Sequence, residues 1–174
     1  METAETAETA ESAETAETAE TGGRMQPARL REARTEDVPE IVALLADDAI
    51  GAGREGPAGD AYYAAFELIA ADPRNQLLVA EADGRIVGTL QLTMIPGLSR
   101  HGMLRGQIEG VRVGADQRGQ GLGRRLIERA IEAAREQGCG LVQLTSDKRR
   151  PDAVRFYQSL GFTASHEGLK LPLR

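Results

Sequence analysis

The residues with the clearest chemical potential are three alternating glycines, Gly119, Gly121 and Gly123, which follow Arg118. Because glycine has no β-carbon, the backbone N–H groups of such a loop can approach a ligand closely. A periodic apolar pattern starts at the loop and predicts a helix over residues 121–137. The first N–H groups of a helix are unpaired and carry the positive end of its dipole. The spacing therefore indicates a site for a phosphate or pyrophosphate group.

Two familiar phosphate-binding motifs do not fit this loop. A Walker loop requires Gly-x4-Gly-Lys, but Gly114 leads to Gly119-Gln120 and the lysine is missing. A dinucleotide fingerprint that starts at Gly119 requires glycine at position 124, where the sequence has arginine. The loop thus indicates an anion site of neither class.

The elements on either side of the loop must position it. Residues 105–113 are rich in β-formers and predict a strand that ends just before the loop. In the helix that follows, the apolar residues share one face; they are Leu122, Leu126, Ile127, Ala130, Ile131 and Ala134. Gly138 and Gly140 end the helix, and residues 141–145 predict another strand. The loop therefore joins a strand to a strongly amphipathic helix.

The other elements predict an α/β chain with a mixed, mostly antiparallel sheet and helices on both faces. Strands are expected over residues 28–34, 76–82, 85–95 and, as the last strand or strand pair, 162–171. Asp83-Gly84 is a strong signal for a hairpin between the second and third of these. Further helices are expected from a cap at Thr35, over residues 60–71 and over residues 151–160.

Two segments resemble the GNAT superfamily of acetyl-CoA-dependent N-acetyltransferases. Arg118-x-x-Gly121-x-Gly123, preceded by a strand that ends in Val111-Arg112-Val113, resembles the acetyl-CoA-binding motif of that family. Asp152-Ala153-x-x-Phe156-Tyr157-x-x-Leu160-Gly161-Phe162 resembles its C-terminal helix and turn. The predicted element order from residue 28 to residue 171 also matches, so the resemblance implies a GNAT-like acyltransferase fold.

The resemblance implies where acetyl-CoA binds. The strand end at residues 111–113 would separate from its neighbour and pair with the pantetheine arm, and backbone amides from Arg118 through Arg124 would hold the pyrophosphate. The implied cofactor-binding residues are Val111, Arg112, Val113, Arg118, Gly119, Gln120, Gly121, Leu122, Gly123 and Arg124. Arg118, Arg124, Arg125 and Lys148–Arg150 concentrate positive charge near the expected phosphates. No metal is implied.

The resemblance also implies two catalytic residues. Tyr157 matches the tyrosine that often protonates the departing thiolate of CoA, and Glu109 matches a strand position that often supplies a general base. A base is needed because a protonated amine is not nucleophilic. A backbone N–H of Val111 is a candidate donor to the developing oxyanion.

Structural roles remain open for both catalytic candidates. Tyr157 could be an aromatic residue that packs with Phe156 and Phe162, and Glu109 could face solvent or pair with Arg105 or Arg112. Tyr62, Tyr63 and Phe66 are expected in the core, with a wall of the acceptor site as the alternative. His166 is expected to be structural, and Cys139 to be a buried thiol.

One position departs from the family pattern. Many members of the family have an asparagine where this sequence has Arg150, so the contact of this position with the cofactor is left open. Arg150 or Lys148 could serve a CoA phosphate. Residues 145–153 and Ser165-His166 loosely resemble the branch that contains aminoalkylphosphonate acetyltransferases.

Composition excludes several other classes. The chain has 174 residues, 27 acidic and 21 basic, and a net charge of -6. Seven glutamates lie in the Glu-Thr-Ala repeat of residues 2–21, and 20 acidic and 20 basic residues lie from residue 25 onward. A neutral domain does not favour nucleic acid. One cysteine forms no internal disulfide, two histidines give no metal-ligand spacing, and no apolar run reaches membrane length.

The repeat has no large apolar residue, so residues 1–24 are expected to be a disordered tail and residues 25–174 a single domain. Met25 is a candidate for the functional start. The N-terminus has neither the basic start nor the apolar core of a signal peptide, which indicates a cytoplasmic protein.

The expected function is transfer of an acetyl group from acetyl-CoA to a primary amine, by direct attack in a ternary complex. The expected acceptor is a small amine, read by the loop over residues 51–59 and the elements around it. One alternative is a non-catalytic module that senses acyl-CoA, and another is acetylation of a protein N-terminus or lysine. Neither nucleic acid nor membrane is expected as a partner. Dimers are frequent in the family, so a homodimer is a candidate assembly.

Overall fold

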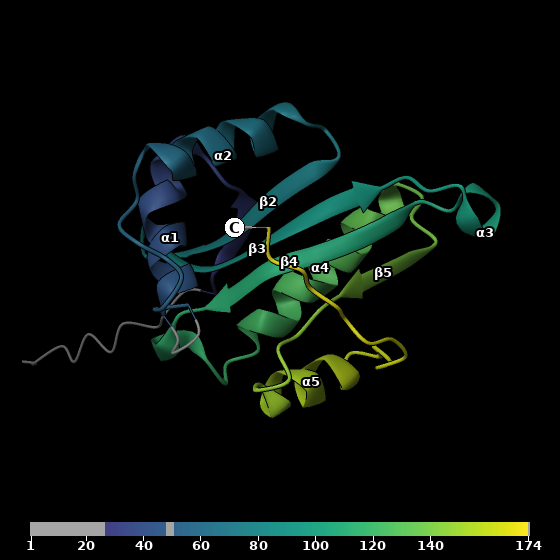
Figure 1. Ribbon diagram of the computed structural model, residues 1–174. Helices are drawn as coiled ribbons and strands as arrows, with labels where there is room; N and C mark the ends of the chain where they lie inside the picture. The colour runs from purple at the N-terminus through teal and green to yellow at the C-terminus, as the bar shows by residue number, and fades with distance from the viewer. Residues whose placement is uncertain (1–26, 48–50, 174) are drawn as a thin grey trace, which may run out of the picture.

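A five-stranded sheet organises the chain, with its strands in the spatial order β1-β2-β3-β4-β5 (Figure 1). The computed structural model describes residues 27–47 and 51–173, so the expected repeat tail and Met25 lie outside the described residues. The strands are β1 (Arg29–Glu32), β2 (Asn75–Ala82), β3 (Arg85–Ile95), β4 (Arg105–Val113) and β5 (Leu141–Leu144). The first four pair antiparallel and β5 runs parallel to β4. The predicted mixed, mostly antiparallel sheet is therefore confirmed.

The β2–β3 hairpin turns at Asp83-Gly84, as predicted. Both residues have positive φ, 49° and 74°, which is the turn geometry that matches the twist of antiparallel strands. A shift of one residue between Ala80 and Glu81 then changes the register, so that Leu78 lies opposite Leu90. Directly opposite residues share a face, so both leucines enter the same apolar layer.

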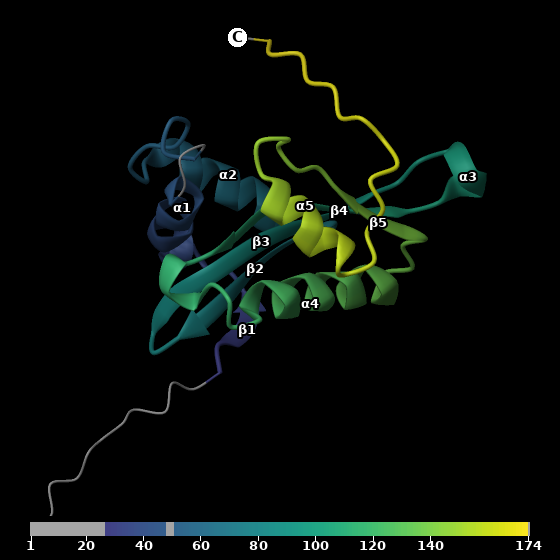
Figure 2. The ribbon, with the colours of Figure 1, turned by 90° about the horizontal axis from the view of Figure 1, so that it is seen from below.

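Helices cover both faces of the sheet (Figures 1 and 2). The α-helices are α1 (Val38–Ala46), α2 (Asp60–Ala71), the short α3 (Ser99–Gly102), α4 (Leu122–Glu136) and α5 (Pro151–Gln158). Helices α1 and α2 lie on one face and α4 lies on the other, whereas α3 lies at the tip of the β3–β4 connection. Helix α5 lies on the β5 side of the sheet, where Phe156 and Tyr157 pack against the main core.

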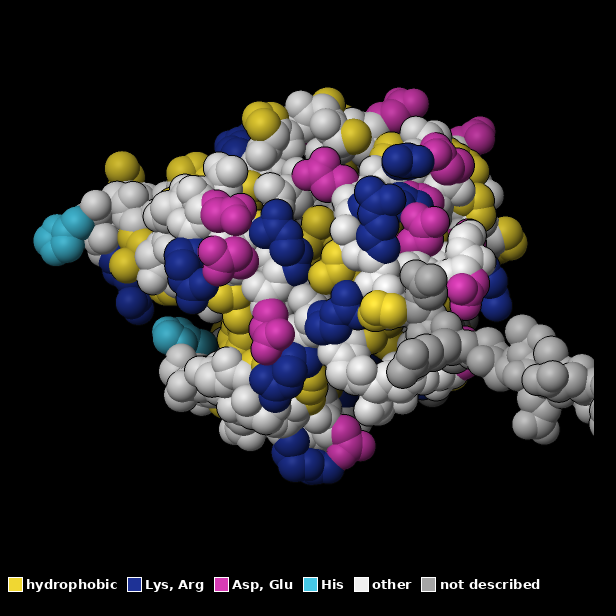
Figure 3. All heavy atoms as spheres, turned by 180° about the vertical axis from the view of Figure 1, so that it is seen from behind, with side chains coloured by type: hydrophobic (Ala, Val, Ile, Leu, Met, Phe, Trp, Pro, Cys, Tyr) yellow, Lys and Arg dark blue, Asp and Glu magenta, His cyan; other side chains and the backbone are white. Residues whose placement is uncertain are grey.

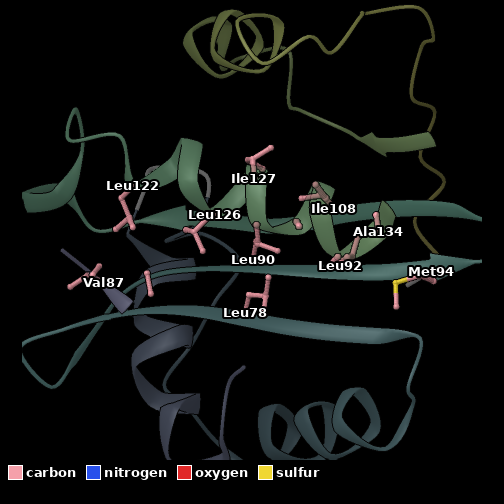
Figure 4. Packing of buried hydrophobic residues seen from close by; sticks show 14 residues of the cluster. Leu78, Val87, Leu90, Leu92, Met94, Ile108, Leu122, Leu126, Ile127 and Ala134 are labelled. Carbon is pink, nitrogen blue, oxygen red and sulfur yellow. The ribbon is translucent and has the colours of Figure 1, made fainter. Parts of the chain in front are cut away.

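The main core lies between α4 and the sheet (Figure 4). Leu126 and Ile127 are completely buried there against Leu90 and Leu92 of β3. All six residues predicted for the apolar face of α4 lie in or against this core. The outer side of the helix carries arginines and glutamates in alternation, and Figure 3 shows both charges interspersed on this face of the molecule. Periodicity of the sequence thus determined which side of α4 is buried.

Two smaller clusters of buried apolar residues involve α1, and a largely buried ion pair lies just before this helix. Asp37 is 4% exposed, and its carboxylate accepts hydrogen bonds from Arg31 Nη1 at 2.6 Å and Nη2 at 2.9 Å. The backbone N–H of Arg34 donates to the same carboxylate at 2.7 Å. Thr35 was the expected helix cap, and this expectation is wrong. Residues Thr35–Asp37 form a 3₁₀ turn before α1, and Asp37 satisfies the free backbone donor.

The predicted strand over residues 162–171 is wrong. Phe162 packs against the main core, but residues 162–173 contain no helix or strand. Their alternating leucines find no apolar surface within the described chain, and Leu169 is 95% exposed. An extended segment without a paired neighbour does not form a strand.

None of the helices within residues 27–47 and 51–173 combines the length and the apolar character that crossing a bilayer requires.

Candidate active site

The centre of the site is a bulge in β4 at Gly110. Glu109 lies opposite Gln91 of β3, but Arg112 lies opposite Thr89, so β4 contains one extra residue in between. Gly110 has φ = +62°, in the left-handed region that favours glycine. The bulge changes which side chains face α4, from Ile108 before it to Val111 and Val113 after it. The sequence prediction missed this bulge, although a glycine inside a strand was a signal for it.

Beyond the bulge, β4 has a free edge. The parallel ladder with β5 runs from Arg105 opposite Leu141 to Ile108 opposite Leu144. In the part of the chain that the structure describes, β4 residues 109–113 have no strand on that side. The carbonyl of Val111 accepts a hydrogen bond from Arg112 Nη1 at 2.9 Å, and the carbonyl of Val113 accepts one from Arg118 Nε at 3.1 Å. The separation of β4 from β5 that the family resemblance implied is therefore present.

The glycine loop follows directly and turns the chain into α4. Gly119 and Gly121 have φ of 79° and 80°, and a β-carbon at either position would point into open space. Gly121 is the residue before the helix, and no side chain among the described residues caps the first turn of α4. The first N–H groups of the helix are therefore available to an anion. The predicted anion loop thus has the required backbone geometry.

The side chain of Arg118 contacts the end of α1 instead of extending toward an anion at the loop. Its Nη2 lies 2.9 Å from Asp47 Oδ2 and also donates to the backbone carbonyl of Asp47 at 3.2 Å. The guanidinium therefore fastens the loop to the C-terminal end of α1. Because the side chain is engaged in this way, any ligand of the loop would contact the backbone of Arg118 rather than its charge.

Most of the positive charge expected around the phosphates is also paired. Arg124 contacts Glu128 at 3.4 Å, and Lys148 contacts Glu167 at 2.6 Å. Arg149 contacts Asp147 at 2.8 Å, and Arg125 donates to the carbonyl of Ala28 at 2.7 Å. The sequence showed the cations but not their partners. An anion bound at this loop would therefore depend on backbone amides more than on side-chain charge.

Tyr157 lies on α5 in a mostly apolar setting. Its ring centre lies 5.2 Å from that of Phe156 and 5.9 Å from that of Phe162. Burial raises the pKa of the Tyr157 phenol above its usual value, and the charges of Arg112 and Arg150 oppose this shift. The phenol therefore stays protonated near neutral pH and can donate a proton. Both the packing role and the acid role considered for Tyr157 are compatible with this position.

Glu109 is exposed, at the point where the β4–β5 ladder has ended. Among the described residues, no hydrogen bond or ion pair joins Glu109 to Arg105 or Arg112. The alternative in which an arginine neutralises Glu109 across the sheet is therefore not observed, and the carboxylate faces solvent.

A layer of hydrogen-bonded polar side chains shares the sheet face with Glu109. Gln143 of β5 donates to Gln107 Oε1 at 2.8 Å. On β2 and β3, the Asn75 Oδ1 atom accepts from Thr93 at 2.6 Å and from Gln91 at 3.1 Å. These residues lie opposite one another in the strand register, and Gln91 lies opposite Glu109. Sequence reasoning overlooked this layer, although alternate polar residues in β3 and β4 were a signal for it.

The aromatic residues of α2 divide between packing and hydrogen bonding. Phe66 is buried with Val38 and Val42, which confirms the expected core role. The Tyr62 hydroxyl donates to Glu55 Oε2 at 3.0 Å and accepts from the N–H of Gly56 at 3.1 Å. Tyr62 thus fastens the loop that precedes α2. His166 is exposed beside Ser165, and burial raises the pKa of the Cys139 thiol.

Comparison with known proteins agrees with this geometry. The sequence profile of the Acetyltransferase (GNAT) family matches residues 35–162. The chain is 32% identical to an aminoalkylphosphonate N-acetyltransferase of Salmonella typhimurium over 142 residues, 82% of this chain and 89% of that enzyme. It is 40% identical to a glucosamine 6-phosphate N-acetyltransferase of Trypanosoma brucei brucei over 90 residues, 52% of this chain and 59% of that enzyme.

A solved structure has the same fold. The crystal structure of a transcriptional regulator from Bacillus halodurans C-125 superposes with a TM-score of 0.82 at 48% identity, covering 84% of this chain and 99% of that one. The family profile spans the glycine loop, the bulged strand and Tyr157. The chain therefore belongs to the GNAT family of acetyltransferases and is an N-acetyltransferase.

Proposed function

We propose that the protein transfers the acetyl group of acetyl-CoA to the primary amine of a small polar acceptor, by direct attack in a ternary complex. The observation that carries this proposal is the continuity of three features: the free edge of β4, the left-handed glycines after it and the uncapped start of α4. Together they offer one strip of backbone donors and acceptors that suits an extended amide chain ending in phosphates.

The residues present fit acetyl-CoA at this strip. The backbone of Val111, Arg112 and Val113 would pair with the pantetheine amides. The amides of Arg118, Gly119, Gln120, Gly121, Leu122, Gly123 and Arg124 would surround the pyrophosphate. A β-carbon at Gly119 or Gly121 would occupy open space over the loop, which is the space that the phosphates would use. Acetyl-CoA supplies an activated thioester, and the chain supplies binding, orientation and proton transfer.

Glu109 and Tyr157 would carry the two proton transfers. The exposed carboxylate of Glu109, on the face of the polar layer, would accept the proton of the incoming ammonium group directly or through water. The N–H of Val111 would donate to the carbonyl oxygen of the thioester as negative charge develops on it. The protonated phenol of Tyr157 would then donate to the departing sulfur, and apolar neighbours keep that phenol in its neutral form.

The polar layer favours a hydrophilic acceptor over an apolar one. Gln107 and Gln143 lie between the ladder end and the start of β4, on the face of Glu109. Side-chain amides of this kind hydrogen-bond hydroxyl, phosphate and phosphonate oxygens. The two curated relatives described above are named for aminoalkylphosphonate and glucosamine 6-phosphate, and both compounds join an amine to such oxygens.

A second candidate function is favoured by one observation. The Bacillus halodurans relative is named a transcriptional regulator. A protein that binds acetyl-CoA as a signal, without turnover, would keep the glycine loop and the free edge of β4. Such a sensor would not require Glu109 or Tyr157. Both residues are present, which favours the enzyme over the sensor.

One assay separates these candidates. Purified protein is mixed with acetyl-CoA and a panel of acceptors, and the release of free thiol is followed. The panel contains 2-aminoethylphosphonate, glucosamine 6-phosphate, unmodified glucosamine, and peptides with free N-termini or lysines. We expect turnover on at least one small amine that bears phosphate or phosphonate.

Calorimetry with acetyl-CoA alone completes the design. Binding without turnover on any acceptor would support the sensor, and turnover on peptides alone would support a protein acceptor. Absence of acetyl-CoA binding would refute both candidates.

A further inference from the structure

Arg105, the first residue of β4, carries a guanidinium group for which the described chain provides no partner. No hydrogen bond or ion pair within residues 27–47 and 51–173 involves its side chain, and its Nε atom is buried. Water reaches only part of the side chain, because Arg105 as a whole is half-buried. A buried charged donor without an acceptor costs free energy, which is recovered when an acceptor binds. The guanidinium of Arg105 is therefore available to a group from outside the described chain.

Arg105 shares a sheet face with Gln107 and Glu109, because alternate residues of a strand lie on the same side. The opposite face of β4 packs against α4. Ile108 is buried in that core, and a β-carbon at Gly106 would lie 3.2 Å from a side chain of α4. Arg105, Gln107 and Glu109 therefore face the side of the sheet that α1 and α2 occupy (Figure 1).

The helices on this side leave the surface around Arg105 open within the described chain. Helices α1 and α2 pack over β2, where Leu77 and Val79 belong to their apolar clusters. The side chains that surround Arg105 in the strand register are half-buried instead of buried; they are Ile95, Leu141, Thr93, Gln107 and Gln143. Three of these five side chains are polar, so a hydrophilic ligand can lie over β4 with hydrogen-bonding groups beneath it.

Two opposite charges lie at the two ends of this surface. Residues of a strand rise about 3.3 Å each, so Arg105 and Glu109 are about 13 Å apart along β4, with Gln107 midway between them. A carboxylate attracts the ammonium form of an amine. A guanidinium suits phosphate, phosphonate and carboxylate groups, because its planar fork can donate two parallel hydrogen bonds to their oxygens. The surface therefore has places for the cationic end and the anionic end of one small molecule.

We propose that the Arg105 guanidinium binds an acidic group of the acceptor, at the end of that molecule away from the amine. The acceptor is then a small zwitterion that carries an amine and a phosphate, phosphonate or carboxylate group. Gln107, which Gln143 holds by a hydrogen bond of 2.8 Å, lies where it can contact the atoms between the two ends. Arg105 determines specificity and takes no part in the proton transfers. This inference rests on the proposed function, because it assigns the acceptor class of that reaction.

Matched pairs of amines test this assignment by binding alone. Protein saturated with CoA, which has no acetyl group to transfer, is titrated by calorimetry with an acid and its neutral counterpart. The pairs are glucosamine 6-phosphate and glucosamine, 2-aminoethylphosphonate and ethanolamine, and β-alanine and 1-aminopropane. In at least one pair, the acid should bind at least about tenfold more tightly than its counterpart. Equal affinity within every pair, or no binding of any acid, would overturn the proposal.

Substitutions at Arg105 show whether this residue causes the preference. Arg105→Met keeps an unbranched stem without the charge and should abolish most of the preference for the acid. Arg105→Lys keeps the charge and loses the paired N–H groups, so it should retain part of the preference. The matched control is Arg85→Met, which should keep the full preference of the parent protein. Arg85 is exposed at the other end of the sheet, beside the β2–β3 turn.

Two further measurements separate this inference from folding and from the reaction. The affinity of Arg105→Met for acetyl-CoA should equal that of the parent, because the glycine loop lies beyond the other end of β4. If that affinity is lost, the comparison of the parent with Arg105→Lys replaces it. The reaction is tested separately by thiol release from acetyl-CoA with the same amines.

The two assays together assign any failure. If the parent acetylates an amine and Arg105→Met keeps the full preference for the acid, the assignment of Arg105 is wrong and the proposed function stands. If Arg105→Met loses the preference but the parent acetylates none of the amines, the assignment of Arg105 is supported and the proposed function is contradicted.

Discussion

A β-carbon at Gly123 would lie 3.4 Å from Cζ of Phe156, so the first turn of α4 lies within van der Waals reach of α5. The same β-carbon would lie 3.7 Å from Val113 Cγ2, at the end of β4. Phe156 in turn packs against Tyr157 at 5.2 Å between ring centres. Gly123 therefore determines how closely the anion loop, the strand end and the candidate acid approach one another.

A graded pair of substitutions at Gly123 should expose this role. Gly123→Ala places one methyl group at ordinary contact distance and should retain activity close to that of the parent protein. Gly123→Leu must displace Phe156, and with it Tyr157, because packed interiors have no spare volume for a larger side chain. We expect kcat/KM to fall by at least about tenfold in the leucine variant. Steady-state kinetics with both variants measures this, and equal activity of the two would contradict it.

Gly121→Ala should weaken the binding of acetyl-CoA. An L-residue in the left-handed conformation costs about 1–2 kcal/mol, so the loop would relax away from the geometry that exposes its amides. The expected loss is about tenfold in affinity, measured by calorimetry. Gly138→Ala is the matched control, because Gly138 has φ = +79° in open space at the far end of α4. It should lower thermal stability to a similar extent and leave the affinity unchanged.

Tyr157→Phe should reduce kcat by about 10²-fold and leave the affinity for acetyl-CoA unchanged. The phenyl ring preserves the packing against Phe156 and Phe162 and removes only the proton donor. Since burial raises the pKa of the phenol, the parent enzyme should keep this step active throughout the neutral range and lose it only in strongly basic solution. Turnover of the variant at the rate of the parent would leave Tyr157 with a packing role alone.

Glu109→Gln should lower kcat/KM at neutral pH by about 10²-fold, because the acceptor ammonium loses the group that would take its proton. At high pH the acceptor amine is already deprotonated, so the activity of the variant should approach that of the parent. A pH–rate profile of both proteins measures this difference. Glu132→Gln on the exposed side of α4 is the control and should follow the parent at every pH. A deficit of constant size across the pH range would indicate that Glu109 positions the substrate instead.

Asp37→Asn should destabilise the fold by about 1–3 kcal/mol, because the guanidinium of Arg31 loses one of its two counterions and keeps only Glu81. Hydrogen bonds from Arg31 lower the pKa of Asp37 below its usual value. The unfolded chain therefore binds the proton at higher pH than the folded one, and the stabilisation is complete above about pH 4 and is lost as pH falls through the folded pKa.

Urea unfolding between pH 2 and pH 7 measures the effect of Asp37→Asn. Over the acidic part of that range, the free energy of unfolding should decrease more steeply for the parent than for the variant. Parallel curves for the two proteins would show that Asp37 contributes nothing to acid sensitivity.

Local signals in the sequence predicted the elements around the site well. The apolar period of α4, the turn at Asp83-Gly84 and the glycines of the loop each act through neighbours a few residues away, so no tertiary contact was needed to read them. The resemblance to the family was carried by the same local motifs. The buried pairing of Asp37 with Arg31 was not predicted, because it depends on how a 3₁₀ turn folds back against β1.

The sequence by itself determined the fold class and the family, and it predicted the anion-binding loop, because each depends on the spacing of a few residues. Tertiary structure decided what surrounds the loop. It paired Arg118 with Asp47, and it ended the β4–β5 ladder at Ile108, which opens the strand edge. It also placed Arg112 and Arg150 near Tyr157 and left residues 162–173 without helix or strand. These outcomes depend on contacts between residues far apart in the chain, and such contacts leave no local pattern.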